Sequence, residues 1–564
     1  MTYTWFMDIA IFTILSLTFY SLWLGSYPLF NPDEGRYAEI AREMLVTGDM
    51  ITPRLNHVPF LDKPILHYWL QAFSMKLFGI NEWAVRLPPA LLGIMGCIVT
   101  YICGRRLFNR RTGILSAAIL ATTPLYFGAA HYANLDLEVA VFISSSLLFF
   151  ITALQRNDAY QFYFYIAAYT ATAFAFLTKG LIGIVFPLLI LSVWIIWFRR
   201  YDFFKKSYLI LGLLLWLIIV LPWYFLVEKA NSQFLEYFFV TQQITRFLSG
   251  IDFNNKTPFW FYIPIILIGF FPWTIFLLQT IRENIEKIWR TPLQYQTEFY
   301  LLLWSAIIFI FFSIPHSKIV GYILPIFPAL AILIGNKLSL DWKQPQSSRN
   351  SLYYFTATII LSFILFLLSY YQWIKFTPQF FPYLVTMIII LVLCGIIALL
   401  MTKKNSLFNL FMICILANIG FLFTLTKSAP YLNTNSTKSL VSQLKQIMRP
   451  EDKVSMYFKY YQDAPFYLQH AIFVVADWNA PDIQNKDNWI REFWYGIQSN
   501  KKNAYLINEE TFWQLYESNQ RMFVLLNINY LPQFQTHAKH YFILGRENNI
   551  LLLSNQPTFL AKNP

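Results

Sequence analysis

Long apolar segments, separated by short polar connections, recur along the chain up to about residue 428. A helix needs about 20 mainly apolar residues to cross a bilayer. Thirteen segments meet this requirement and are predicted to be transmembrane helices. They lie near residues 8–28, 87–104, 112–130, 135–154, 160–178, 180–198, 207–227, 258–280, 298–315, 318–337, 352–372, 380–401 and 406–427.

Two shorter segments, in the polar loop after the first apolar segment, have the period of amphipathic helices. Apolar side chains recur every three to four positions in residues 31–45, and Gly48 follows. The same period recurs after Pro64 and stops at Gly79. Proline favours the first turn of a helix, and glycine favours the position just after its end. The pattern therefore predicts two helices, the first lying on the outer membrane surface.

The last part of the chain has a different composition, because Asn, Gln, Lys and Asp become frequent again. Short β-like runs alternate there with helical patterns, which predicts a small α/β domain. The chain is thus expected to have a transmembrane domain (1–428), with outer loops 29–86 and 228–257, and a C-terminal domain (429–564). The predicted strands are Val454–Phe458, Ile472–Val475, Ala504–Ile507, Met522–Leu526, Tyr541–Leu544 and Ile550–Leu553, and the helical patterns include Ser439–Met448 and Glu510–Ser518.

Composition supports a membrane protein. The chain is 57% hydrophobic and 13% charged, and its mean hydropathy is +0.46. Soluble domains have about 25% charged residues. These values exclude a disordered chain and an ordinary cytosolic enzyme. The net charge of +13 fits basic cytoplasmic loops better than a nucleic-acid partner. The four cysteines lie in apolar stretches without metal-site spacing.

The distribution of basic residues predicts the orientation, because Lys and Arg accumulate in cytoplasmic loops. With the N-terminus in the cytoplasm, the connections on that side hold most of the loop cations. An odd number of helices then places the C-terminal domain outside the cytoplasm. The cations are Arg105, Arg106, Arg110, Arg111, Arg156, Arg199, Arg200, Lys205, Lys206, Arg282, Lys287, Arg290, Lys337, Lys343, Arg349, Lys403 and Lys404.

The first candidate functional residues lie at the start of the first amphipathic helix. Asp33 and Glu34 lie in its first turn, where the helix dipole favours anions, and Arg36 follows one turn after Asp33. The same pattern has a purely structural explanation, in which the acids cap the helix and form surface ion pairs with the arginine. The position directly after a membrane span, beside an arginine able to hold phosphate, favours a functional Asp33. Glu34 is a weaker candidate for substrate binding.

A second candidate pair precedes the second amphipathic helix. Asp62 and Lys63 stand at the edge of that helix, just before Pro64. Lys63 could bind phosphate, and Asp62 could hold a metal or a sugar group. An acid at a helix start and an interfacial lysine that snorkels are an equally good explanation.

Further charges stand at predicted outer membrane ends. Lys179, Arg246 and Lys318 are cations there, and Asp136 is an acid at another helix end. Ionisable residues at membrane depth are costly and usually mark a site, although each lysine or arginine alone could snorkel. Three cations together predict an anion pocket at the membrane surface. Asp136 is either a sugar or cation contact or a helix cap.

This pattern predicts a reaction on a lipid-linked sugar. The sequence has neither a GxxxxGK[ST] motif nor a GxGxxG motif after a strand. Basic residues would stabilise a lipid phosphate that departs as the C1–O bond breaks. A carboxylate would orient or deprotonate the acceptor. One acid opposite a departing phosphate suggests a single displacement with inversion, and we state this as a hypothesis.

Several motifs resemble the bacterial lipid A aminoarabinose transferases and, more broadly, the GT-C glycosyltransferases that include protein mannosyltransferases. The resemblance covers roughly residues 25–340 and is weaker around 461–467. The motifs are Pro-Asp-Glu-Gly-Arg-Tyr-Ala-Glu-Ile-Ala-Arg-Glu-Met (32–44), Leu-Asp-Lys-Pro-Ile with Tyr-Trp (61–69), Leu-Thr-Lys-Gly (177–180) and Ser-Lys-Ile-Val-Gly-Tyr-Ile-Leu-Pro (317–325).

The resemblance implies thirteen helices, an outer α/β domain and an undecaprenyl-phosphate sugar donor. Asp33 matches the essential acid of the family. Asp62 stands where relatives usually carry Glu, at a metal position. Relatives often read Glu-His where this chain has Gln242-Gln243, and the change removes a metal-capable group. The residues that match donor-phosphate ligands are Arg36, Lys63, Lys179 and Arg246.

We therefore predict a multi-spanning α-helical GT-C enzyme of the bacterial inner membrane, active as a monomer in contact with membrane lipid. It would transfer an aminosugar from a polyprenyl phosphate to lipid A phosphate, with Lys318 and Tyr322 as further substrate contacts. No cofactor is required by the sequence, and a divalent metal is left open. A related enzyme acting on protein, O-antigen or core glycan is one alternative. A transporter of lipid-linked sugar is another, although its site would lie at the midplane.

Overall fold

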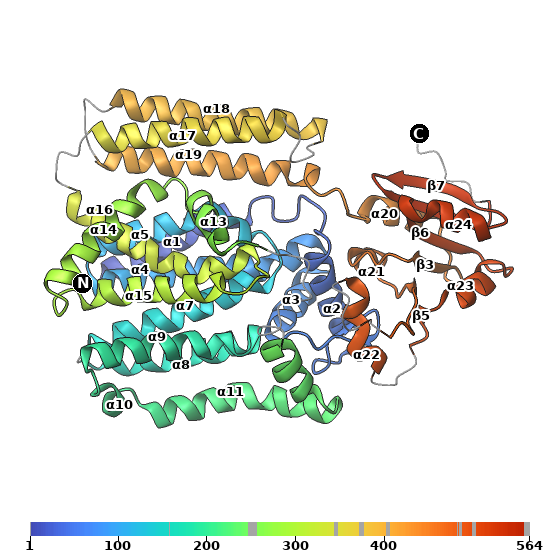
Figure 1. The fold of residues 1–564 in the computed structure, drawn as a ribbon, viewed down its shortest axis with the longest axis horizontal. Helices are drawn as coiled ribbons and strands as arrows, with labels where there is room; N and C mark the ends of the chain where they lie inside the picture. The colour runs from blue at the N-terminus through green and yellow to red at the C-terminus, as the bar shows by residue number, and fades with distance from the viewer. Residues whose placement is uncertain are drawn as a thin grey trace.

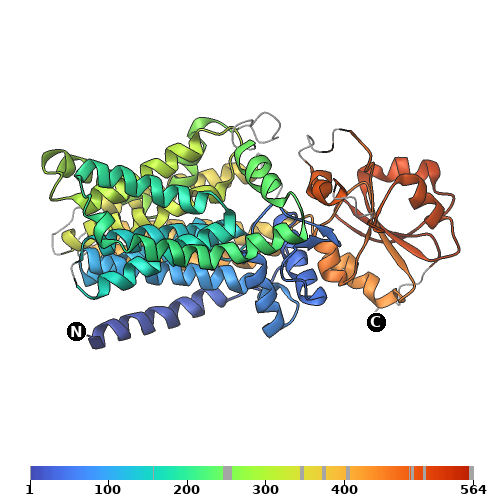
Figure 2. The ribbon, with the colours of Figure 1, turned by 90° about the horizontal axis from the view of Figure 1, so that it is seen from below.

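The computed structural model describes residues 2–156, 158–245, 257–342, 348–370, 377–401, 407–481, 483, 488–498 and 503–557. A bundle of long helices occupies one end, and a sheet with short helices, the C-terminal region (residues 429–557), occupies the other (Figure 1). The N-terminus lies at the end of the bundle remote from this region, as Figure 2 also shows. The fold is thus a helical membrane protein with a C-terminal α/β region, as predicted.

The bundle helices are long because their sequences are apolar on nearly all sides. Such helices are stable where lipid or other helices cover them. In Figure 1, α17, α18 and α19 form one outer layer and α8, α9 and α11 another. The bundle helices are α1 (Thr2–Ser21), α4 (Glu82–Leu107), α5 (Arg110–Ala121), α6 (Pro124–Ala130), α7 (Leu135–Leu154), α8 (Tyr160–Lys179), α9 (Ile182–Phe198), α10 (Phe203–Lys206), α11 (Leu209–Ala230), α13 (Tyr262–Gly269), α14 (Thr274–Arg290), α15 (Gln296–Ser313), α16 (Phe327–Asp341), α17 (Ser348–Tyr370), α18 (Phe381–Leu400) and α19 (Leu407–Ser428).

Among the described residues, eight helices are long and apolar enough to cross a membrane. Two pairs bent by 65° and 116° bring the number to ten if each pair is one span. The first pair bends where Pro124 begins α6, since proline cannot continue a helix. The other predicted segments are occupied by α8, by the shorter apolar helix α9, and by α17, in which the apolar stretch Leu352–Leu367 is the shorter one. The number of thirteen spans stays a prediction.

Both amphipathic helices of the first loop are present. They form α2 (Asp33–Thr47) and α3 (Leu66–Phe78), and Gly48 closes α2 with a positive φ of 74°. A short hairpin of β1 (Arg54–Leu55) and β2 (Val58–Pro59) joins them. Most of α2 is buried between α3 and the C-terminal region, so it has protein on more than one side.

The C-terminal region contains a six-stranded sheet with the order β5-β4-β3-β6-β8-β7. The first four strands in that order are parallel, and β8 and β7 are antiparallel to their neighbours. All six predicted strands are confirmed within a few residues. They are β3 (Lys453–Tyr457), β4 (Phe473–Val475), β5 (Leu506–Ile507), β6 (Met522–Asn527), β7 (Phe542–Glu547) and β8 (Ile550–Ser554), and the helices are α20 (Lys438–Ile447), α21 (Asp463–Leu468), α22 (Trp494–Gln498), α23 (Glu509–Tyr516) and α24 (Leu531–His537).

The C-terminal region is held directly against the start of α2. The amide of Asn31 donates to Asp463 Oδ1 at 2.6 Å, and its oxygen accepts from the Asp463 backbone N–H at 2.9 Å. Asp463 also accepts from Ser436 and Thr437. These bonds satisfy a buried carboxylate, as burial of a charge requires. The contact joins residues 432 positions apart.

The close contact between the start of α2 and Asp463 depends on Gly35, which has no side chain. A Cβ on Gly35 would lie 2.6 Å from the Asp463 nitrogen and 2.9 Å from its Cα. These are backbone atoms, so the region would have to move away. We expect Gly35→Ala to lower the free energy of unfolding by about 1–3 kcal/mol. Thermal unfolding of the purified protein measures this. Gly128→Ala is the control, since nothing lies within 4 Å of its Cβ, and equal effects in both variants would contradict the explanation.

Candidate active site

A cavity of about 600 Å³ lies where the bundle meets the C-terminal region. Its walls come from the start of α2, the loop before α3, the first turn of α7, the last turn of α8 and the 3-10 helix Val320–Ile326. Loops of the C-terminal region close the other side. The cavity is polar and charged, unlike the apolar bundle around it.

The cavity brings together most of the predicted site residues from distant parts of the sequence. Glu34 and Lys318 do not line it, and Arg246 lies outside the described residues. The predicted residues that line it are Asp33, Arg36, Asp62, Lys63, Asp136, Lys179 and Tyr322.

Arg36 links two carboxylates in the cavity. Its guanidinium lies 2.8 Å from Asp33 Oδ1 and 3.2 Å from Glu492 Oε1 of the C-terminal region. Burial by itself lowers the pKa of Arg36, but the two carboxylates more than offset this effect and its pKa is raised. Arg36 is therefore a fixed cation. The second oxygen of Asp33 accepts from Asn134 at 3.2 Å, which orients the carboxylate at the cavity wall.

Lys179 stands in the last turn of α8, where the helix dipole favours a cation. Gly180 ends the helix with a φ of +78°. The ammonium of Lys179 is paired with Asp136 and lies 4.1 Å from the centre of the Tyr322 ring. A Cβ on Gly321 would lie 2.5 Å from Asp136, so the glycine admits this acid. Lys179, Asp136 and Tyr322 thus form one cluster at the cavity wall.

Asp62 is held by hydrogen bonds from uncharged groups. It accepts from Tyr237 Oη at 2.5 Å and from Gln242 Nε2 at 3.2 Å, both in the π-helix Glu236–Thr245. Lys63, the next residue, also lines the cavity. In the described part of the chain, no three His, Cys, Asp or Glu side chains are grouped so that they could hold a metal ion. The described residues around Asp62 therefore do not fit a metal site.

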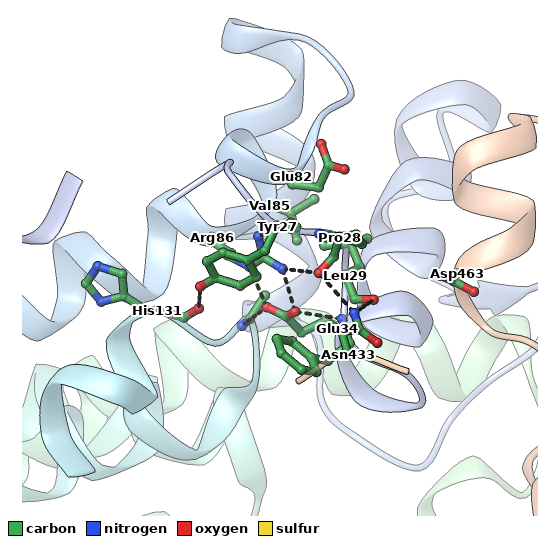
Figure 3. Close-up of polar contacts among 12 residues, drawn as sticks. Tyr27, Pro28, Leu29, Glu34, Glu82, Val85, Arg86, His131, Asn433 and Asp463 are labelled. Atoms are coloured by element: carbon green, nitrogen blue, oxygen red, sulfur yellow. Dashed lines mark hydrogen bonds and ion pairs between the residues drawn. The ribbon is translucent and has the colours of Figure 1, made fainter. Parts of the chain in front are cut away.

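Glu34 is buried in an ion pair beside the cavity (Figure 3). Its carboxylate binds Arg86 of α4 at 2.8 and 2.7 Å and accepts the backbone N–H of Ala133 and Phe30. Arg86 donates its remaining hydrogen bonds to the carbonyls of Leu24, Tyr27 and Pro28. Both side chains are fully buried. The structure thus places Glu34 in a buried ion pair next to Asp33 in the chain, and Glu34 does not line the cavity.

Lys318 is also directed elsewhere. It is 4% exposed and donates to the carbonyl of Thr257 at 3.1 Å. Tyr322, four positions later, does reach the cavity. The motif that contains both residues thus contributes its tyrosine to the cavity, and its lysine binds the loop before α13.

Sequence reasoning missed the wall that the C-terminal region supplies. Lys459, Arg491 and Glu492 bring charge to the cavity, and several amide side chains lie beside them. Burial raises the pKa of Glu492, and the nearby Arg36 partly offsets this effect. The sequence signals were the weak resemblance around 461–467 and the charged pair Arg491-Glu492 between aromatic residues in Trp489-Ile-Arg-Glu-Phe-Trp.

Comparisons with known proteins agree with this architecture. Residues 62–225 match the family described as dolichyl-phosphate-mannose-protein mannosyltransferase. The undecaprenyl phosphate-α-4-amino-4-deoxy-L-arabinose arabinosyl transferase of Erwinia tasmaniensis is 32% identical over 330 residues, which cover 58% of each chain. The corresponding protein of Edwardsiella ictaluri is 33% identical over 57% of each chain. The alignments thus span less than two thirds of these relatives.

Solved structures extend the likeness to nearly the whole chain. ArnT from Cupriavidus metallidurans in the apo state has a TM-score of 0.82 and 25% identity, covering 97% of this chain and 98% of that one. The same protein bound to undecaprenyl phosphate gives a TM-score of 0.81. This chain is therefore similar in sequence to the undecaprenyl phosphate aminoarabinose transferases and has the GT-C fold of ArnT.

Proposed function

We propose that this protein is an inverting glycosyltransferase that moves a sugar from undecaprenyl phosphate to a phosphate of lipid A. The sugar is an aminosugar such as 4-amino-4-deoxy-L-arabinose. The observation that carries the proposal is the charged cavity at the ends of apolar helices, in which Asp33, Arg36, Lys63 and Lys179 meet. The relatives' names and the structure of ArnT with undecaprenyl phosphate support the donor.

The arrangement suits a single displacement. The lipid tail of the donor would lie against the bundle, and its phosphate would lie near Lys63 and Lys179. An acceptor phosphate oxygen would form a bond to C1 as the C1–O bond to the donor phosphate breaks, and that phosphate would leave with the electron pair. Fixed cations stabilise the charge that develops on the leaving group. An acceptor phosphate is already anionic, so Asp33 would orient it; an acceptor hydroxyl would need Asp33 as base.

We also infer the location and organisation of the protein. The N-terminus and the C-terminal region lie at opposite ends of the bundle, which supports their placement on opposite sides of a membrane (Figure 2). Basic loops favour a cytoplasmic N-terminus, so residues 429–564 would form a periplasmic domain beside the transmembrane domain 1–428. The protein would act as a monomer in the inner membrane. Arg246 remains a proposed donor ligand.

Two alternatives make different predictions. A related transferase would use protein, O-antigen or core glycan as acceptor. A transporter for lipid-linked sugar would place its binding site near the middle of the membrane. The cavity instead lies at one end of the bundle, under the C-terminal region, and this position favours a transferase.

Mass spectrometry of lipid A from cells with and without the gene tests the function. Loss of a discrete pentosamine or hexosamine mass without the gene is the expected result and identifies the sugar class. An unchanged lipid A spectrum in cells that express the protein would contradict lipid A as the acceptor.

The donor cluster gives a separate prediction. We expect Lys179→Gln to raise the KM for the undecaprenyl-phosphate sugar by roughly 10-fold to 100-fold, because a charge-assisted contact is lost. Steady-state kinetics with purified protein measure this. Lys427→Gln is a matched control, since Lys427 is an exposed lysine in the last turn of α19 that does not line the cavity. A donor KM equal to that of the control would contradict the role of Lys179.

A further inference from the structure

The cavity has two walls of different chemistry. The wall from the bundle and its loops holds three cations, Arg36, Lys63 and Lys179, and three acids, Asp33, Asp62 and Asp136. The wall from the C-terminal region holds the cations Lys459 and Arg491 and one acid, Glu492, which is already paired with Arg36 at 3.2 Å. Among the described residues, the second wall therefore has more cations than acids.

Two amide side chains of the second wall are oriented by hydrogen bonds from the backbone. Asn488 accepts the N–H of Ile490 through Oδ1 at 3.0 Å, and Asn527 accepts the N–H of Asn529 through Oδ1 at 3.1 Å. The other end of each amide is its NH₂ group, which can only donate. Amide donors beside cations suit the oxygen atoms of a phosphate or a hydroxyl group.

Two residues that line the cavity, Tyr460 and Arg36, each carry a buried polar atom. Tyr460 Oη and Arg36 Nε are buried and have no hydrogen-bond partner among the described residues. The ring of Tyr460 stacks on Trp489 with centroids 6.1 Å apart, so the hydroxyl is held in place.

From these observations we propose that the C-terminal wall is the acceptor subsite, and that Lys459 and Arg491 bind a phosphate of a phosphorylated sugar headgroup. The inference rests on the proposed function and adds the residues that recognise the acceptor. The donor phosphate is tied to the bundle by its lipid tail. Inversion requires the acceptor to approach C1 from the side opposite the leaving phosphate, and the C-terminal wall offers cations to the cavity that belong to a different element from the bundle.

Binding to purified protein in lipid nanodiscs tests the subsite without catalysis. The probes are lipid A and the same lipid A after removal of its phosphates. The wild type is expected to bind phosphorylated lipid A more tightly. The double variant Lys459→Gln/Arg491→Gln should lose roughly 10-fold to 100-fold in affinity for phosphorylated lipid A, and bind dephosphorylated lipid A as the wild type does. Its affinity for undecaprenyl phosphate should be unchanged.

Two controls keep the result specific. Lys453→Gln removes a cation of the same region that does not line the cavity and should change nothing. The charge-preserving variant Lys459→Arg/Arg491→Lys should keep most of the preference for phosphorylated lipid A. If Lys459→Gln/Arg491→Gln keeps the full preference, the acceptor subsite is wrong. If the wild type transfers no sugar to lipid A, the proposed function fails, and this result is distinguishable from the first.

Discussion

Asp33→Asn is expected to abolish sugar transfer while leaving the protein folded. Asp33 is the cavity acid whose two oxygens contact Arg36 and Asn134, and its side chain is 34% exposed. An amide keeps the shape but loses the charge that orients or deprotonates the acceptor. The expected loss of kcat is about 10²-fold to 10⁴-fold. The measurement is transfer from undecaprenyl phosphate-linked sugar to lipid A by purified protein.

A thermal unfolding curve separates chemistry from folding in this test. The midpoint should change little, because the side chain is partly exposed and its ion pair is local. Asp477→Asn is a matched control, since Asp477 is an exposed acid of the C-terminal region that does not line the cavity. Wild-type kcat in the Asp33→Asn variant would remove the catalytic assignment.

Arg86→Met is expected to have the largest effect on stability. The change leaves the carboxylate of Glu34 buried without its cation, and it removes the side-chain donor of the Leu24 and Tyr27 carbonyls and one of two donors to Pro28. Breaking one partner of a buried ion pair costs about 3–5 kcal/mol. Thermal or denaturant unfolding in detergent measures the loss.

The Arg86→Met variant should also lose sugar-transfer activity, because of where Asp33 lies. Asp33 precedes Glu34 in the first turn of α2, so activity should fall together with stability. Arg110→Gln is the control, because Arg110 pairs with Asp8 at an exposed position and should cost less than about 1 kcal/mol. If Arg86→Met lowered the free energy of unfolding as little as Arg110→Gln does, the Glu34–Arg86 ion pair would not be what holds the start of α2.

Local patterns were sufficient for the elements that frame the site. The helix period and its bounding Pro and Gly residues gave α2 and α3, because capping and amphipathicity depend on near neighbours in sequence. Alternating short runs gave the six strands in the same way. The number of membrane spans is harder, since bends such as that between α5 and α6 divide an apolar run without a change in composition.

The sequence predicted the cavity residues that come from the bundle and its loops, and it missed those of the C-terminal region. Asp33, Lys63 and Lys179 stood out because charges next to apolar runs are costly. Lys459 lies in a region where charges are ordinary, and Glu492 was marked only by the aromatic residues around the Arg491-Glu492 pair. Glu34 was marked as a site candidate by the sequence but lies in a buried ion pair. This could not be predicted, because its partner Arg86 comes from another helix and the two meet only in the folded protein.

The joint at Asn31 and Gly35 has a consequence for engineering chimeras of this protein. The turn that presents Asp33 is fastened to the bundle through Glu34 and to the C-terminal region through Asn31. If the C-terminal region were replaced by that of a relative, residues 31–35 would no longer pack against the surface that they fit in this protein. Grafts of acceptor specificity should therefore transplant residues 31–35 together with residues 429–557, as one inseparable module.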